Sequence, residues 1–149
     1  MKIEIYSRKA IMKRLQEGAL KNTAVVSFYD PPSSRTPADY APVDYGDLCD
    51  MVFPVEEFDI DIEVLSEYGL TFDTYLSCAP ELAKFIKLAC AEGMDIICQC
   101  EYGQSRSAAC AAAIREYYYS DGISVFADYR YYPNQMIFNK LLEALNETE

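Results

Sequence analysis

The sequence predicts a single α/β domain over residues 1–149, with a central, mainly parallel sheet of about four strands flanked by helices. Short apolar strands alternate with helical segments along the chain, and no hairpin signal joins one strand to the next. The length of 149 residues suits one domain, and the hydrophobic fraction of 51% is typical of a globular protein. Ligand sites in such sheets lie at the carboxyl ends of the strands.

The elements follow from the order of apolar runs and capping residues. Residues 2–6 alternate between polar and apolar side chains, which predicts a strand. Three apolar runs predict further strands over residues 24–29, 48–55 and 94–100. Caps and apolar spacing predict helices over 8–18, 80–90 and 107–119, and a last helix after Pro133 that buries Ile137, Leu141, Leu142 and Leu145. Prolines make residues 30–47 a loop. The acidic stretch 56–68 favours neither a helix nor a strand.

The charge balance excludes several partners. Lys and Arg number 13 against 24 Asp and Glu, for a formal charge of -11. Such a surface repels nucleic acid and anionic membranes, so neither is predicted as a partner. The chain has no histidine, which excludes a histidine base and a zinc site built on imidazole. No cofactor or metal is predicted.

The N-terminus and the cysteines predict a cytoplasmic protein. Residues 1–6 lack the apolar core of a signal peptide. The six cysteines are therefore expected to be thiols in a reducing compartment, and the absence of a Cys-x-x-Cys pair argues against a structural metal.

The chemistry concentrates between Cys100 and Ser107. A buried strand is predicted to end at Cys100, and a helix begins directly after Arg106. This geometry aims backbone N–H groups and the positive end of a helix at one point, while Gly103 lets the loop curl inward. Arg106 adds a planar fork that matches two phosphate oxygens. In this field Cys100 is predicted to be a thiolate.

These residues together predict phosphoryl transfer. The thiolate of Cys100 would attack phosphorus in line and form a cysteinyl-phosphate. Arg106 and the backbone amides would stabilise the charge on the equatorial oxygens. The hydroxyl of Ser107 would donate to the sulfur and make it a better leaving group. The predicted phosphate-binding loop comprises Glu101, Tyr102, Gly103, Gln104, Ser105 and Arg106.

The segment resembles the Cys-x5-Arg signature of the protein tyrosine and dual-specificity phosphatases, in a bacterial-type chain. The similarity includes Gly103, Ser107, the late position of the loop in the chain, and Pro133-Asn134 before the terminal helix. It implies that Cys100 is the nucleophile, Arg106 the phosphate clamp and Ser107 the helper hydroxyl. The early loop of low-molecular-weight phosphatases and arsenate reductases, and the shorter loop of rhodaneses, fit less well.

The loop also departs from this family. Gln99 replaces the histidine that usually precedes the nucleophile, which puts the rate in question more than the reaction type. Tyr102 stands where a small residue is common, and Glu101 adds a negative charge beside the thiolate. Both features would narrow or discourage substrate entry.

The general acid is predicted to be an aspartate that follows an earlier strand. Asp59 is favoured because it comes just after the 48–55 run, where the family places its acid. Asp61 is the alternative and Asp30 a more distant one. The spacing of Asp59, Asp61 and Glu63 invites a calcium interpretation, but the glycine and distant glutamate of an EF-hand loop are missing.

The sequence thus predicts a cysteine-dependent phosphatase that hydrolyses phosphate monoesters through a cysteinyl-phosphate intermediate. Phosphotyrosine in a protein, or a small aryl phosphate, is the favoured substrate, since polyanions usually need more basic residues. The alternative is a phosphate-binding pseudophosphatase module with little turnover, which Gln99, Tyr102 and the distant acid favour.

Overall fold

A parallel sheet forms the centre of the molecule in the computed structural model, which describes residues 1–32 and 41–148. Within these ranges the sheet has four strands in the order β1-β4-β2-β3, and every pair is parallel. The strands are β1 (Ile3–Tyr6), β2 (Thr23–Tyr29), β3 (Met51–Glu56) and β4 (Asp95–Gln99). The predicted fold class is confirmed.

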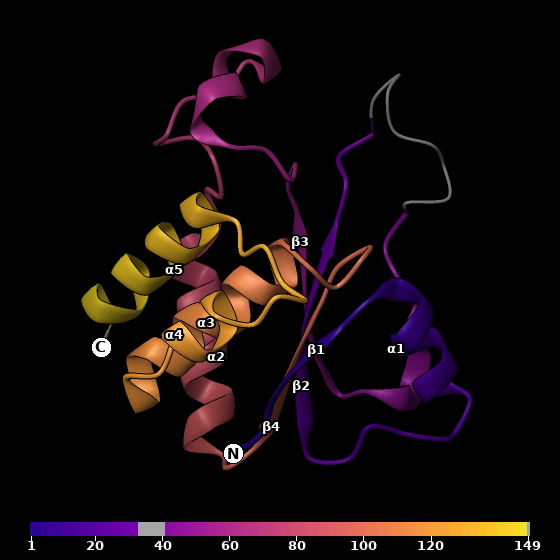
Figure 1. Cartoon of the computed structure of the whole chain (residues 1–149). Coiled ribbons are helices and arrows are strands. Elements are labelled where there is room, and N and C mark those ends of the chain that lie inside the picture. The colour runs from indigo at the N-terminus through magenta and orange to yellow at the C-terminus, as the bar shows by residue number, and fades with distance from the viewer. Residues whose placement is uncertain (33–40, 149) are drawn as a thin grey trace.

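Helices cover both faces of this sheet (Figure 1). One face carries α2 (Ala79–Ala91), α3 (Arg106–Tyr119), the short α4 (Ile123–Phe126) and α5 (Gln135–Glu147). On the other face lies α1 (Arg8–Leu15). The strands run from the N-terminal edge at the bottom of the view to a carboxyl edge at the top, where the β4–α3 connection emerges.

In the central strands, the side chains of successive residues point to opposite faces of the sheet, and apolar side chains lie on both faces. In β4, Ile96 and Cys98 belong to the large core under α2, α3 and α5, whereas Ile97 belongs to the smaller core under α1. In β2, Val26 and Val25 divide between the two cores in the same way. Strands buried on both faces need apolar residues at successive positions, which is the pattern of the predicted runs.

The structure corrects several predicted boundaries. Helix α1 ends at Leu15 rather than Gly18, whose φ of 126° lies outside helical geometry. Strand β3 begins three residues later than predicted, because Gly46–Leu48 forms a 3-10 turn, η2. The unassigned acidic stretch contains a 3-10 helix, η3 (Ile62–Tyr68), and α4 was not predicted. Residues 33–40 of the predicted proline-rich loop lie outside the described residues.

The last helix follows the prediction closely. Asn134 accepts a hydrogen bond from the backbone N–H of Ile137 at 3.0 Å and so caps α5. Ile137, Leu141 and Leu145 are buried, and Leu142 packs partly buried against the same core. Across residues 1–32 and 41–148, no helix combines the length and the apolar character that spanning a membrane requires.

Candidate active site

The connection between β4 and α3 places the predicted nucleophile at the carboxyl edge of the sheet. Cys100 follows β4 directly, and its N–H donates to the carbonyl of Tyr6 at 3.2 Å. Its side chain is buried, and Sγ lies 3.0 Å from Oγ of Ser107. Helix α3 begins at Arg106, so Ser107 is its second residue rather than its first. The predicted nucleophile and the predicted helper hydroxyl are therefore in hydrogen-bond contact.

The first carbonyls of this loop point away from its centre. The carbonyl of Cys100 accepts from Nε2 of Gln99 at 2.9 Å, and the carbonyl of Glu101 accepts from the N–H of Arg8 at 3.0 Å. In a trans peptide the C=O of one residue and the N–H of the next point in opposite directions. The N–H groups of Glu101 and Tyr102 are consequently turned away from these outer partners.

The last carbonyls of the loop are held in the same way. The carbonyl of Gln104 accepts from the N–H of Tyr132 at 2.7 Å, and that of Ser105 accepts from the N–H of Asn134 at 3.2 Å. The N–H groups of Ser105 and Arg106 therefore also turn to the inner side. Backbone amides that converge at the N-terminus of a 14-residue helix form an anion-binding concavity.

Gly103 is required by the packing of the loop against β1. Its φ is 67°, a conformation that favours glycine. A Cβ atom at this position would lie 2.7 Å from the backbone nitrogen of Ser7. The backbone nitrogen cannot move aside as a flexible side chain can, so the close approach of loop and β1–α1 connection depends on a glycine.

Arg106 is buried at the base of the concavity. Its Nη1 donates to Oδ1 of Asp30 at 2.7 Å and to the carbonyl of Glu57 at 2.8 Å, and the residue is only 4% exposed. Its Nε is buried and has no hydrogen-bond partner among the described residues. Since buried polar groups are nearly always hydrogen-bonded, this donor indicates a site for an acceptor such as a phosphate oxygen.

Gln99 performs a structural task beneath the loop. Its Oε1 accepts from the hydroxyls of Ser27 at 2.5 Å and Tyr45 at 2.9 Å, while its Nε2 holds the carbonyl of Cys100. Burial raises the pKa of Tyr45 to about 12, so this phenol stays protonated as a donor. The glutamine thus supports the loop. It occupies the position where the tyrosine and dual-specificity phosphatases, whose signature this segment resembles, usually have a histidine.

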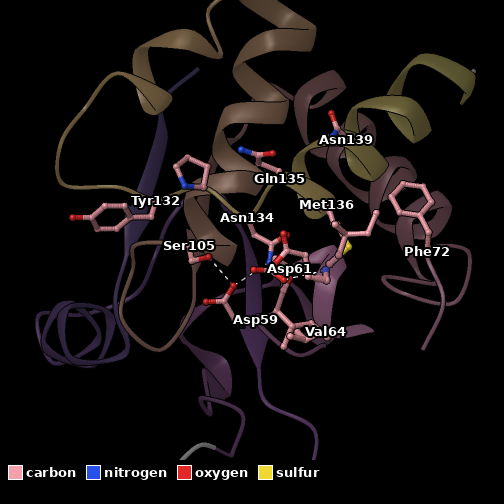
Figure 2. Close-up of a pocket in the computed structure, with 14 residues that line it drawn as sticks. Asp59, Asp61, Val64, Phe72, Ser105, Tyr132, Asn134, Gln135, Met136 and Asn139 are labelled. Carbon is pink, nitrogen blue, oxygen red and sulfur yellow. Dashed lines mark hydrogen bonds between the residues drawn. The ribbon is translucent and has the colours of Figure 1, made fainter. Parts of the chain in front are cut away.

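Asp59 lies against the other end of the loop (Figure 2). Its Oδ1 accepts from Oγ of Ser105 at 2.6 Å and from Nδ2 of Asn134 at 3.1 Å. Asn134 also donates to the carbonyl of Ile60 at 2.9 Å. Oδ2 of Asp59 has no hydrogen-bond partner in the part of the chain that the structure describes. The residue is exposed.

The other two acid candidates have different partners. Asp61 caps η3 by accepting from the N–H of Glu63 at 3.1 Å, a local structural role. Asp30 forms the ion pair with Arg106. Of the three aspartates, Asp59 is the one that contacts the loop through a hydroxyl, and Asp30 the one that contacts its arginine.

A pocket of about 720 Å³ adjoins Asp59 and Ser105. Figure 2 shows it between the η3 region, with Asp61 and Val64, and the start of α5, with Asn134 and Met136. Its lining mixes polar and apolar side chains. The pocket gives a ligand bound at the loop room to extend past Asp59.

The acidic segment is held by residues that the sequence analysis did not assign to the site. The buried carboxylate of Glu57 accepts from the backbone N–H groups of Leu76 at 2.7 Å and Phe58 at 2.9 Å. The hydroxyl of Tyr75 donates to the carbonyl of Phe58 at 2.6 Å, and burial raises the pKa of this phenol. The order Pro133-Asn134 was a signal for Asn134; Glu57 and Tyr75 had none.

Both departures inside the loop have a structural outcome. Glu101 forms an ion pair with Arg8 at 2.7 Å, so its charge is compensated. Tyr102 is 68% exposed.

Three of the other five cysteines are buried. Cys98 and Cys110 are fully buried in the main core, and the hydrogen bond with Cys98, together with burial, raises the pKa of Cys110. Cys49 is also buried, and all six cysteines are free thiols. Among residues 1–32 and 41–148, no cluster of three or more His, Cys, Asp or Glu side chains is arranged to hold a metal ion.

Comparison with known proteins identifies the fold. No family model matches the sequence, and no curated protein matches it. Among solved structures, a human tyrosine phosphatase-like serine/threonine/tyrosine-interacting protein superimposes with a TM-score of 0.56 at 15% identity, covering 92% of this chain and 83% of the other. PTPMT1 in complex with PI(5)P gives a TM-score of 0.54 at 12% identity and covers 98% and 91%.

This is the fold of the tyrosine and dual-specificity phosphatases. The similarity covers nearly the whole chain, so the sheet, both helical layers and the loop belong to one shared architecture.

Proposed function

We propose that the protein is a cysteine-dependent phosphatase that hydrolyses phosphate monoesters at the loop between β4 and α3. The observation that carries this proposal is the loop itself: inward amides, the buried donor Nε of Arg106, and Cys100 in contact with Ser107. Each part serves one requirement of phosphoryl transfer to a thiolate. The phosphatase fold supports the proposal.

In the first step, the thiolate of Cys100 attacks phosphorus, and the bond from phosphorus to the ester oxygen breaks. Asp59 gives its proton to the departing oxygen, which leaves as an alcohol or phenol. The amides of residues 101–106 and the guanidinium of Arg106 stabilise the charge on the three other oxygens. The product is a cysteinyl-phosphate.

In the second step, water attacks phosphorus and the phosphorus–sulfur bond breaks. Asp59, now a carboxylate, takes the proton from this water. Ser107 donates its hydroxyl hydrogen bond to the departing sulfur of Cys100 across the observed 3.0 Å and so stabilises the thiolate. Since the chain has no histidine, a carboxylate is the base available at neutral pH.

Charge favours an isolated aryl phosphate as the substrate. The two arginines at the loop, Arg106 and Arg8, each already pair with a carboxylate. With a formal charge of -11, the chain offers few cations for a second phosphate group. Phosphotyrosine in a protein, or a small aryl phosphate, therefore suits the site better than a polyphosphorylated ligand. Free thiols are consistent with work in the reducing cytoplasm, which we propose as its location.

Hydrolysis of p-nitrophenyl phosphate tests this function. Wild-type protein should release p-nitrophenol, vanadate should inhibit it, and Cys100→Ser should abolish it. Cys110→Ser is the matched control, because it changes a buried thiol of the core next to the site without touching the nucleophile. Equal activity of Cys100→Ser and wild type would contradict the proposal.

The second candidate function is phosphate binding with little turnover. Gln99 favours it, because the glutamine holds the carbonyl of Cys100 but supplies no imidazole to tune the thiol. Under this alternative, phosphate would protect Cys100 from iodoacetate although p-nitrophenyl phosphate is not hydrolysed. Labelling and turnover measured together distinguish the two functions.

A further inference from the structure

Arg8 holds the loop residue Glu101 at two points. Nε of Arg8 lies 2.7 Å from Oε2 of Glu101, and the side chains are 19% and 15% exposed. The backbone N–H of Arg8 donates to the Glu101 carbonyl at 3.0 Å. The Arg8 guanidinium also donates to the carbonyl of Ala41. One residue of α1 thus fixes both the side chain and the main chain of a loop residue.

The charge of Glu101 would otherwise oppose the proposed chemistry. Glu101 directly follows Cys100 and belongs to the segment whose amides would bind phosphate. A carboxylate close to a phosphate dianion and a thiolate repels both of them. Since the pair is mostly buried, dissolved salt would screen this repulsion only weakly. A paired cation at this position removes it.

Helix stability does not account for the position of Arg8. Arg8 is the first residue of α1, and the first turn of this helix holds no acidic residue. A cation at a helix N-terminus is unfavourable for the helix, because it opposes the positive end of the dipole. The ion pair with Glu101 gives the arginine a compensating role.

We propose that Arg8 is a positioning residue for the phosphate site, which neutralises Glu101 and turns the Glu101 carbonyl outward so that the loop accepts a phosphate dianion. The inference rests on the proposed function, since it requires that the loop bind phosphate. It assigns to the first residue of α1 a part of the site that the Cys-x5-Arg segment alone does not contain.

Steady-state kinetics with p-nitrophenyl phosphate, together with inhibition by inorganic phosphate, tests this pairing. Arg8→Met should raise both KM and the inhibition constant of phosphate roughly tenfold, as expected for an unpaired nearby charge, with kcat changed about twofold or less. Glu101→Gln should bind phosphate at least as tightly as wild type. The double variant, Arg8→Met with Glu101→Gln, should return to within about threefold of wild type, because it leaves no unpaired charge.

Arg14→Met is the matched control, since it removes one positive charge from the same helix at a residue that bonds only Gly18 and Ala19 among the described residues. Arg8→Met that behaves like Arg14→Met would overturn the proposal. So would a double variant that is as weak as Arg8→Met, because the arginine would then act by holding the fold.

The failure of the proposed function would look different. If wild type does not hydrolyse the ester, protection of Cys100 from iodoacetate by inorganic phosphate gives the same comparison through binding alone. Rescue by Glu101→Gln in that assay supports the pairing, and no rescue contradicts it. Thermal unfolding of each variant shows whether Arg8→Met is folded. If Arg8→Met is unfolded, Arg8→Lys takes its place; because it keeps the charge, it should retain most of the affinity for phosphate.

Discussion

The two regions that meet at Ser105 and Asp59 are built in different ways. The β4–α3 loop is short in sequence, with the nucleophile, the arginine and the helper hydroxyl within eight consecutive residues. The acidic segment after β3 is positioned by distant side chains: Asn134 contacts Asp59 across 75 positions of the chain, and Ser105 contacts it across 46. A local motif thus contains the proposed nucleophile, while tertiary contacts position the proposed acid.

This contrast predicts different consequences of substitution. Changes in the loop should remove activity toward every phosphate monoester, because all of them need the same bound phosphoryl group. Substitutions around Asp59 should lower kcat/KM more for substrates with poorer leaving groups. The predictions below test that division, from the largest expected effect to the smallest.

Arg106→Lys should cause the largest loss, roughly 10³-fold or more in kcat/KM for every substrate. A lysine ammonium is a point charge and lacks the planar fork that bonds Asp30, Glu57 and a phosphate oxygen together. Steady-state kinetics with an activated aryl phosphate ester and with a phosphotyrosine peptide measure the loss of kcat/KM for each substrate. Comparable losses for both substrates are expected; a loss confined to the peptide would place Arg106 outside the phosphate site.

Asp59→Asn should lower kcat/KM for phosphotyrosine peptides by roughly 10²–10⁴ and that for activated aryl esters far less. Phenol from tyrosine is a poor leaving group that needs a proton, whereas an activated phenolate departs without one. The basic limb of the pH profile should flatten in the variant, since that limb reports loss of the acid's proton. A set of aryl phosphates of graded leaving-group ability measures this dependence.

Asp61→Asn is the control for the acid, because Asp61 caps η3 and should have little effect on any substrate. A large, leaving-group-dependent loss in Asp61→Asn but not in Asp59→Asn would move the assignment by two residues. The same loss in Asp30→Asn would assign the acid to the carboxylate paired with Arg106.

Asn134→Ser should have a smaller effect than Asp59→Asn, a roughly tenfold loss that grows with poorer leaving groups, as for a residue that orients the acid. Serine can still cap α5 but does not reach Asp59 as the Asn134 amide does. Combined with Asp59→Asn, Asn134→Ser should cause almost no further loss of kcat/KM, because the acid that Asn134 orients has already been removed. Additive losses would show that Asn134 acts independently of Asp59.

The elements that the sequence predicted best are those set by local patterns. All four strands, the helix after Arg106 and the cap of the last helix follow from apolar runs and capping residues. The Cys100-to-Ser107 segment could likewise be predicted as a candidate anion site, because its geometry needs only a strand end, a glycine and a helix start.

The remaining features depend on contacts that no local pattern reveals. The outward carbonyls of Glu101 and Gln104 are held by Arg8 and Tyr132, which come from opposite ends of the chain. The sequence presented Glu101 as an obstacle, whereas the structure pairs its charge. Spacing alone also left Glu57, the buried anchor of the acidic segment, unrecognised.

A crystal structure of the wild-type protein with tungstate, a tetrahedral oxyanion analogue of phosphate, tests the central claim most directly. The account predicts the anion above Sγ of Cys100, held by the N–H groups of residues 101–106 and by Nε of Arg106, with Oδ2 of Asp59 facing its outer side. A loop without anion at millimolar tungstate, or an anion bound elsewhere while Nε of Arg106 stays unpaired, would contradict it.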